Sequence, residues 1–182
     1  MSHKDFILIG LALLCAALAT LLWLERRRRR LAAEGFGAHR ILFPFDERTL
    51  SMSALDTTLR IAAAERATLV PTYLAVVPMR VSLDAALPRQ VEIALPLLDR
   101  IEERATRRGV PVDSIIEPGR SYRHALKRSL DRGLPHRVVV AAASPAGHGF
   151  RSDDVAWMLD HTPSELLVLK AAPDAAGPVA GI

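Results

Sequence analysis

Loop 144–150, SPAGHGF, and the residues directly after it combine a histidine, two glycines and two carboxylates, residue types that could take part in ligand chemistry. His148 stands there between two glycines, where an imidazole could contact a phosphate or respond to pH, or simply serve as a turn residue. Glycines let backbone amides approach a phosphate, and the amino terminus of a helix favours negative charge. Asp153 and Asp154, however, place two carboxylates at the predicted helix start. They satisfy the helix dipole and would repel a phosphate.

Sequence motifs of several enzyme classes are missing. No Gly-x-x-x-x-Gly-Lys-Ser/Thr loop occurs, which excludes a P-loop ATPase. No Gly-x-Ser-x-Gly elbow occurs, so we interpret Ser144 as a loop residue. One cysteine, Cys15, provides neither a disulfide framework nor a thiol metal site. Four further histidines are scattered along the chain without the spacing of metal ligands; they are His124, His136, His148 and His161. We therefore expect no catalytic residues and no metal site; weak ATP hydrolysis stays open.

The elements that must position the loop alternate between buried strands and amphipathic helices. Strands are predicted at 40–45, 69–77, 112–117, 137–143 and 165–171, and helices at 50–66, 88–108, 121–132 and 153–161. Segment 137–143, RVVVAAA, is almost wholly apolar, as an interior parallel strand should be. The alternation predicts an α/β fold, with a five-stranded parallel sheet and helices on both faces.

Particular residues predict where the helices begin, bend and end. Ser51 or Ser53 is expected to cap the first helix, and Gly109 and Gly133 to end the second and third. Pro96 is expected to kink or split the second helix, because proline removes one hydrogen bond of the helix. Asp46 follows the first strand and could equally cap the first helix.

An apolar segment near the amino terminus, FILIGLALLCAALATLLWL at 6–24, predicts one transmembrane helix. Nineteen uncharged residues span about 28 Å at the helical rise per residue, close to the hydrocarbon thickness of a bilayer. Five consecutive arginines follow the segment, and we expect them to contact anionic lipid headgroups. By the positive-inside rule these residues are cytoplasmic, and the domain after them is too. They are Arg26, Arg27, Arg28, Arg29 and Arg30.

The positive charge is concentrated next to this segment. Lys4 and the five arginines are six of the 24 basic residues, and Asp5 and Glu25 are two of the 20 acidic residues. That leaves 18 of each from Leu31 onward, so the rest of the chain is neutral. A nucleic-acid-binding domain would carry a basic face, and we therefore expect no nucleic-acid partner. The predicted organisation is an external terminus at 1–5, a basic linker at 25–39, the domain at 40–171 and a disordered tail at 172–182.

Five short sequences carry a family resemblance, in the same order as in the family. They are ILFPFD at 41–46, AVVP at 75–78, GVPVDSIIEPG at 109–119, RVVVAAAS at 137–144 and HTPSELLVLK at 161–170. Taken together, they resemble the universal stress protein family over about residues 40–171. The resemblance implies an open sheet that binds ATP or AMP in some members, and self-association through the last strand. It also implies that an aspartate ending the first strand meets base and ribose, and that a glycine-rich loop after the fourth strand holds phosphates.

The chain matches this pattern at some positions and departs from it at others. Asp46 stands at the family's aspartate, and Val76 at the matching end of the second strand. The loop retains Gly147 but is shortened, and Ser152 with Asp153 replaces the family's Gly-Ser or Gly-Thr. The resemblance thus implies a nucleotide site at Asp46, Val76, Gly147 and Ser152, with ATP binding lost or weakened.

Three functions follow as hypotheses. The first is a membrane-tethered regulatory or interaction domain, a homodimer without a cofactor. The second is a sensor that binds ATP or AMP. The third is a subunit that docks on an unknown membrane protein, such as a transporter or a sensor kinase.

Overall fold

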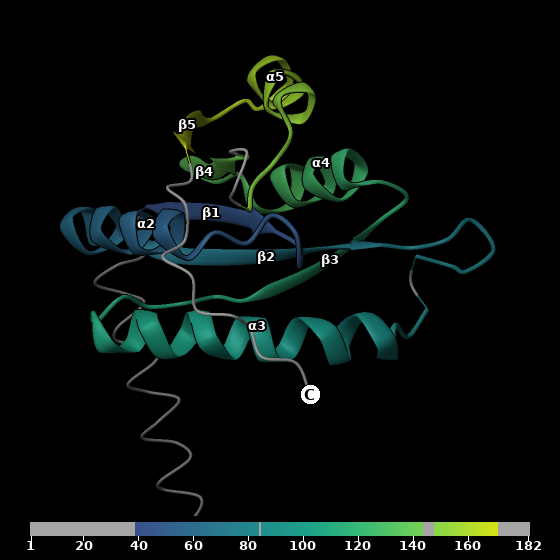
Figure 1. Ribbon diagram of the computed structural model, residues 1–182, viewed down its shortest axis with the longest axis horizontal. Coiled ribbons are helices and arrows are strands. Elements are labelled where there is room, and N and C mark those ends of the chain that lie inside the picture. Colours follow the sequence, from purple (N-terminus) through teal and green to yellow (C-terminus); the bar gives the residue numbers. More distant parts are fainter. Residues whose placement is uncertain (1–38, 84, 144–147, 171–182) are drawn as a thin grey trace, which may run out of the picture. The chain divides into compact units, whose positions relative to one another are not determined.

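The computed structural model describes residues 39–83, 85–143 and 148–170 (Figure 1). Within these residues the chain forms one parallel sheet in the order β3-β2-β1-β4-β5. The strands are β1 (Arg40–Phe45), β2 (Thr68–Val76), β3 (Ile115–Gly119), β4 (Arg137–Ala142) and β5 (Glu165–Lys170). This arrangement confirms the predicted five-stranded parallel sheet.

The two faces of the sheet are covered by different helices. These are α2 (Met52–Glu65), α3 (Pro88–Arg107), α4 (Tyr122–Gly133) and α5 (Ser152–His161). Successive side chains of a strand point to opposite faces. Phe43 accordingly packs with the apolar residues of α2 and α3, whereas its neighbour Leu42 packs with those of α4 and α5. The helices therefore cover both faces, as predicted, with α3 and α4 on opposite sides in Figure 1.

The first helix begins where one of the two predicted caps places it. Ser51 accepts a hydrogen bond from the backbone N–H of Ala54 and is the N-cap of α2. At the end of α3, Gly109 adopts the left-handed conformation with φ 68°. At the end of α4, Leu134 adopts it instead, and Gly133 is the last helical residue. Of the two roles left open for Asp46, that of helix cap is excluded, because Ser51 is the N-cap.

Pro96 does not split the second helix. α3 continues from Pro88 to Arg107 with Pro96 inside it. A proline in a helix interior costs about 3 kcal/mol. The helix buries Ala94, Leu98 and Ile101 against the sheet. We infer that this burial outweighs the cost of the proline.

Strand β3 begins later than predicted. Val112 makes only an isolated bridge to Leu69, and the continuous ladder to β2 starts at Ile115. Other boundaries differ from the predicted ones by a residue or two.

Several predicted features lie outside the described residues. These are the apolar segment 6–24, the arginine run 26–30, the tail 172–182 and Gly147. Among the residues that the structure describes, no helix is long and apolar enough to cross a membrane.

Candidate functional site

The strand order brings the predicted site residues to one edge of the sheet. β1 lies between β2 and β4, and the chain reaches these two neighbours by connections running in opposite directions. Ligands of open parallel sheets bind at the carboxyl ends of the strands, where the strand order reverses. Asp46 follows β1 and Val76 ends β2, so both lie at this edge. The structure thus places two of the four predicted site residues together.

Asp46 organises a tight turn directly after β1. Its side chain is only 2% exposed. Oδ1 accepts hydrogen bonds from the backbone N–H groups of Arg48 and Thr49, at 3.0 and 2.8 Å, and from Thr49 Oγ1 at 2.8 Å. The backbone N–H of Asp46 donates in return to Thr49 Oγ1 at 2.7 Å. Short polar side chains commonly stabilise turns in this way. One carboxylate oxygen is therefore fully engaged in the fold.

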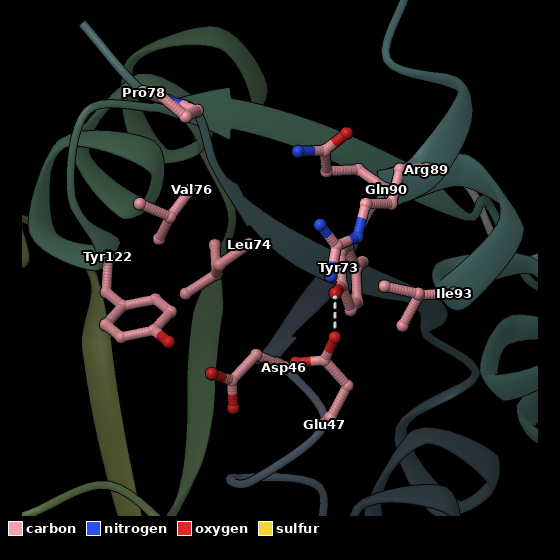
Figure 2. Close-up of a pocket in the computed structure, with 10 residues that line it drawn as sticks. All are labelled: Asp46, Glu47, Tyr73, Leu74, Val76, Pro78, Arg89, Gln90, Ile93 and Tyr122. Atoms are coloured by element: carbon pink, nitrogen blue, oxygen red, sulfur yellow. Dashed lines mark hydrogen bonds between the residues drawn. The ribbon is translucent and has the colours of Figure 1, made fainter.

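A cavity of about 280 Å³ opens beside Asp46 (Figure 2). Carboxylates from the turn, tyrosine rings and apolar side chains line it, together with two residues from the first turn of α3. The lining residues are Asp46, Glu47, Tyr73, Leu74, Val76, Pro78, Arg89, Gln90, Ile93 and Tyr122. Two carboxylates and one guanidinium give this lining a negative balance.

Two tyrosines supply most of the aromatic surface of the cavity. The Tyr73 hydroxyl donates to Glu47 Oε1 at 2.8 Å, and the Tyr73 ring packs edge-on against Phe45. Figure 2 shows the Tyr122 hydroxyl directed toward Asp46. Burial and the carboxylate of Asp46 raise the pKa of Tyr122 to about 12. Burial and the hydrogen bond to Glu47 raise the pKa of Tyr73 still further. Both phenols therefore stay neutral at physiological pH, as hydrogen-bond donors.

The segment after β4 folds back onto the end of its own strand. The backbone N–H of Phe150 donates to Ala141 O at 2.7 Å, and that of Ala143 donates to Phe150 O at 2.8 Å. Gly149, the residue before Phe150, approaches the backbone at the end of β4 so closely that an added Cβ would lie 2.6 Å from Ala142 C. His148 contacts Arg48 O through Nδ1 at 3.0 Å. A carbonyl only accepts, so Nδ1 donates in this contact, and the imidazole joins the two loops at this edge.

The first turn of α5 carries negative charge, as the sequence predicted. Asp154 pairs with Arg123 of α4 at 3.1 Å, and Asp153 lies 3.9 Å from Arg151 on the exposed surface. Ser152 is exposed at the first position of the helix and does not line the cavity. The structure therefore does not bring Ser152 to the cavity lining, and its predicted contact with a nucleotide stays a prediction. Ser152 begins α5, which follows β4, whereas the cavity is built by β1, β2, α3 and α4.

Sequence patterns did not single out most of the cavity lining. Glu47 could have been found from the sequence, because it follows the predicted site residue Asp46 directly. Tyr73 stands three residues before Val76 in β2, and only the pairing of Tyr73 with Phe45 in register places its ring beside the turn. Arg89 and Tyr122 belong to α3 and α4, and no local pattern connects them to Asp46. Within the described residues no three metal-ligating side chains cluster.

Comparisons with known proteins place this arrangement in a recognised fold. No family model matches the chain, and no curated protein does. Among solved structures, a protein from the universal stress protein family of Burkholderia pseudomallei is similar. Its TM-score is 0.55 at 24% identity, over 72% of this chain and 96% of that one.

Two further solved structures were crystallised with nucleotides. A universal stress protein in complex with cAMP matches with a TM-score of 0.54 and 16% identity, over 74% of this chain and 98% of that one. An Arabidopsis thaliana universal stress protein family protein with AMP bound matches with a TM-score of 0.52 and 14% identity, over 78% of this chain and 97% of that one. At these identities the likeness establishes the fold alone, and the described domain has the fold of universal stress protein domains.

Proposed function

We propose that the domain is a regulatory module, not an enzyme, that belongs with the universal stress proteins. In this proposal the cavity beside Asp46 binds an adenine mononucleotide of the AMP or cAMP class, and ATP binds only weakly. One observation carries the proposal: Asp46 and Val76, which the family resemblance selects, border one cavity at the carboxyl edge of the sheet. The AMP and cAMP held by two similar structures support this ligand class.

The size and charge of the cavity favour a ligand with few phosphates. Its volume of about 280 Å³ is just below the roughly 300–1,000 Å³ typical of small-molecule sites. Asp46 and Glu47 outnumber Arg89 in its lining, and Asp153 and Asp154 add negative charge at the start of α5. Every phosphate added to a mononucleotide brings further negative charge toward these carboxylates. ATP is therefore the disfavoured member of the series.

Calorimetry on the full-length chain in a mild detergent, with magnesium, tests this function. We expect AMP or cAMP to bind with a dissociation constant of roughly 10–100 µM and ATP to bind more weakly than about 1 mM. Asp153→Asn leaves the Asp154–Arg123 pair intact and removes one negative charge from the start of α5, the region where the family resemblance places the phosphates. This variant should strengthen ATP binding several-fold and change AMP binding less. No heat with millimolar AMP and cAMP, or tighter binding of ATP than of AMP, would contradict the proposal.

We also propose that the module works at a membrane. The apolar segment 6–24 and the five arginines after it support a single-pass anchor, an external amino terminus and a cytoplasmic domain. Tethering would raise the local concentration of the domain near a membrane protein partner, such as a transporter or a sensor kinase. Carbonate extraction of cell membranes tests the anchor: a tethered chain stays in the pellet, whereas a peripheral one is released.

Self-association through β5 is the remaining part of the proposal. β5 is an edge strand of the sheet, and Val168 on it is 36% exposed. Edge strands carry unpaired backbone groups that can pair with another copy. Val168→Lys should shift the full-length protein toward monomer in light scattering if β5 mediates dimerisation. An unchanged mass would exclude β5 as the interface.

A further inference from the structure

The segment that follows β2 is held by one arginine from the loop after the neighbouring strand. Arg120 comes directly after β3, and its Nη1 lies 2.5 Å from Pro78 O and 2.8 Å from Val81 O. Val77 O is 3.4 Å from the same nitrogen. Nη1 carries two hydrogens, so the two short bonds, to Pro78 O and Val81 O, are the principal ones. The longer contact to Val77 O shares one of these two hydrogens. Val77, Pro78 and Val81 lie beyond the end of the β2–β3 ladder, and a charged donor makes strong hydrogen bonds to their carbonyls.

The backbone from which Arg120 extends is itself fixed. Its N–H donates to His124 Nδ1 in the first turn of α4 at 3.2 Å. The residue before it, Gly119, packs so closely on α4 that an added Cβ would lie 2.4 Å from Ala125 N. Gly119 O also accepts from the N–H of Val77 at 2.8 Å. The guanidinium therefore reaches the segment 77–81 from a rigid base, half-buried beside it.

This segment forms part of the rim of the candidate cavity. Pro78 lines the cavity, directly after the buried Val77, and the same connection leads to Arg89 and Ile93 on α3. Apart from the Arg120 contacts, the described hydrogen bonds within 78–81 comprise one turn bond, from the N–H of Val81 to Pro78 O at 3.0 Å. A four-residue segment with so few bonds loses its conformation readily when its main contact is removed.

We propose that Arg120 is the positioning residue of the cavity. By binding the carbonyls of Pro78 and Val81 it holds the rim in its observed conformation, and thereby sets the affinity for the ligand without touching it. Arg120 does not line the cavity. The statement about affinity rests on the proposed nucleotide function, whereas the statement about the rim does not.

The chain offers a matched control for this role. Arg80 is an exposed arginine of the same segment, and among the residues that the structure describes it makes no hydrogen bond or ion pair. Arg80→Ala and Arg120→Ala remove the same charge from the same region, but only the second removes the contacts to the rim. Arg120→Lys keeps the positive charge and loses the planar geometry of the guanidinium. If Arg120→Ala folds poorly, which circular dichroism would reveal, Arg120→Lys provides a second test of the same contacts.

Two measurements on the full-length chain in detergent decide the matter. Hydrogen exchange without ligand should be about tenfold faster at Val81 in Arg120→Ala, less accelerated in Arg120→Lys and unchanged in Arg80→Ala. The dissociation constant for AMP should rise roughly three- to tenfold in Arg120→Ala and stay constant in Arg80→Ala.

Each outcome has a definite meaning. Exchange in Arg120→Ala equal to that in Arg80→Ala would overturn the proposal, and so would accelerated exchange with unchanged AMP affinity. If the wild-type chain binds neither AMP nor cAMP, the proposed function fails, and with it any role of Arg120 in affinity. Exchange then decides alone whether Arg120 holds the rim, because that measurement requires no ligand.

Discussion

Glu117 on β3 accepts a hydrogen bond from Nε of Arg128 on α4 at 2.9 Å, and its side chain is completely buried. Arg132, one turn further along α4, contacts the other carboxylate oxygen at 2.8 Å, as an ion pair without good hydrogen-bond geometry. The two arginines thereby join the edge strand β3 to the helix that covers it. The contact with Arg128 is a specific hydrogen bond, whereas the contact with Arg132, whose side chain is 58% exposed, is weaker because solvent screens it.

Glu117→Ala should therefore destabilise the domain strongly. Removing one partner of a buried ion pair costs about 3–5 kcal/mol, and we expect the lower end because both arginines reach solvent. The double variant Glu117→Met with Arg128→Leu should recover much of this loss. Asp113→Ala, which breaks an exposed pair with Arg40, should cost less than about 1 kcal/mol. Thermal unfolding followed by circular dichroism measures all three. Equal losses for Glu117→Ala and Asp113→Ala would show that burial of the pair is unimportant.

Substitutions at Asp46 should separate its structural role from its ligand role. Asp46→Asn keeps an oxygen that can accept the hydrogen bonds of Arg48 and Thr49, so its stability should stay within about 0.5 kcal/mol of wild type. Asp46→Ala leaves those amides without their acceptor and should cost about 1–2 kcal/mol. Both variants should weaken AMP binding if the carboxylate contacts the ligand. Wild-type affinity in Asp46→Asn would assign Asp46 to the turn alone.

The two tyrosines should ionise only at strongly alkaline pH. Tyr73 and Tyr122 are the only tyrosines of the chain, so the absorbance at 295 nm reports on the cavity directly. The folded-state pKa is raised for both, to about 12 for Tyr122, against about 10 when unfolded. Their contribution to stability is therefore present below pH 10 and is lost as the pH rises from 10 toward 12.

Wild type should accordingly show little tyrosinate at pH 10.5, whereas the chain in guanidinium chloride should titrate near pH 10. Tyr122→Phe should make the stability of the domain depend less on pH between 10 and 12. A folded protein with half-ionised tyrosines at pH 10 would contradict the described environment of the cavity.

Two glycines should respond oppositely to the same substitution. Gly149→Ala would place a Cβ 2.6 Å from Ala142 C and Ala143 N, which are backbone atoms that cannot move aside easily. Such crowding typically costs about 1–3 kcal/mol. Gly133→Ala, at the end of α4, meets no atom within 4 Å, and alanine is the better helix former by about 0.5–1 kcal/mol. Melting temperatures should therefore fall for the first variant and rise or stay unchanged for the second.

Local patterns in the sequence were sufficient for most of the framework. Alternation of apolar strands with amphipathic helices predicted the order of the elements and the parallel sheet, because a strand returning through a helix pairs in parallel. Ser51 and Gly109 fixed one helix start and one helix end through contacts within a few residues. The prediction from Pro96 that the second helix would split was wrong. Helix propensity is a local property, whereas the helix is held together by the burial of Leu98 and Ile101 against the sheet, which the local sequence does not show.

For the site, the sequence determined the position of Asp46 at the end of β1 and the two carboxylates that open α5, since each depends only on neighbours along the chain. The tertiary structure decided the rest. It showed that Asp46 builds a turn, that Tyr73 and Tyr122 complete the cavity, and that Arg120 reaches back to Pro78 and Val81. Side chains from four separate elements meet there only because parallel strands end at one edge of the sheet, and no spacing along the chain records that meeting.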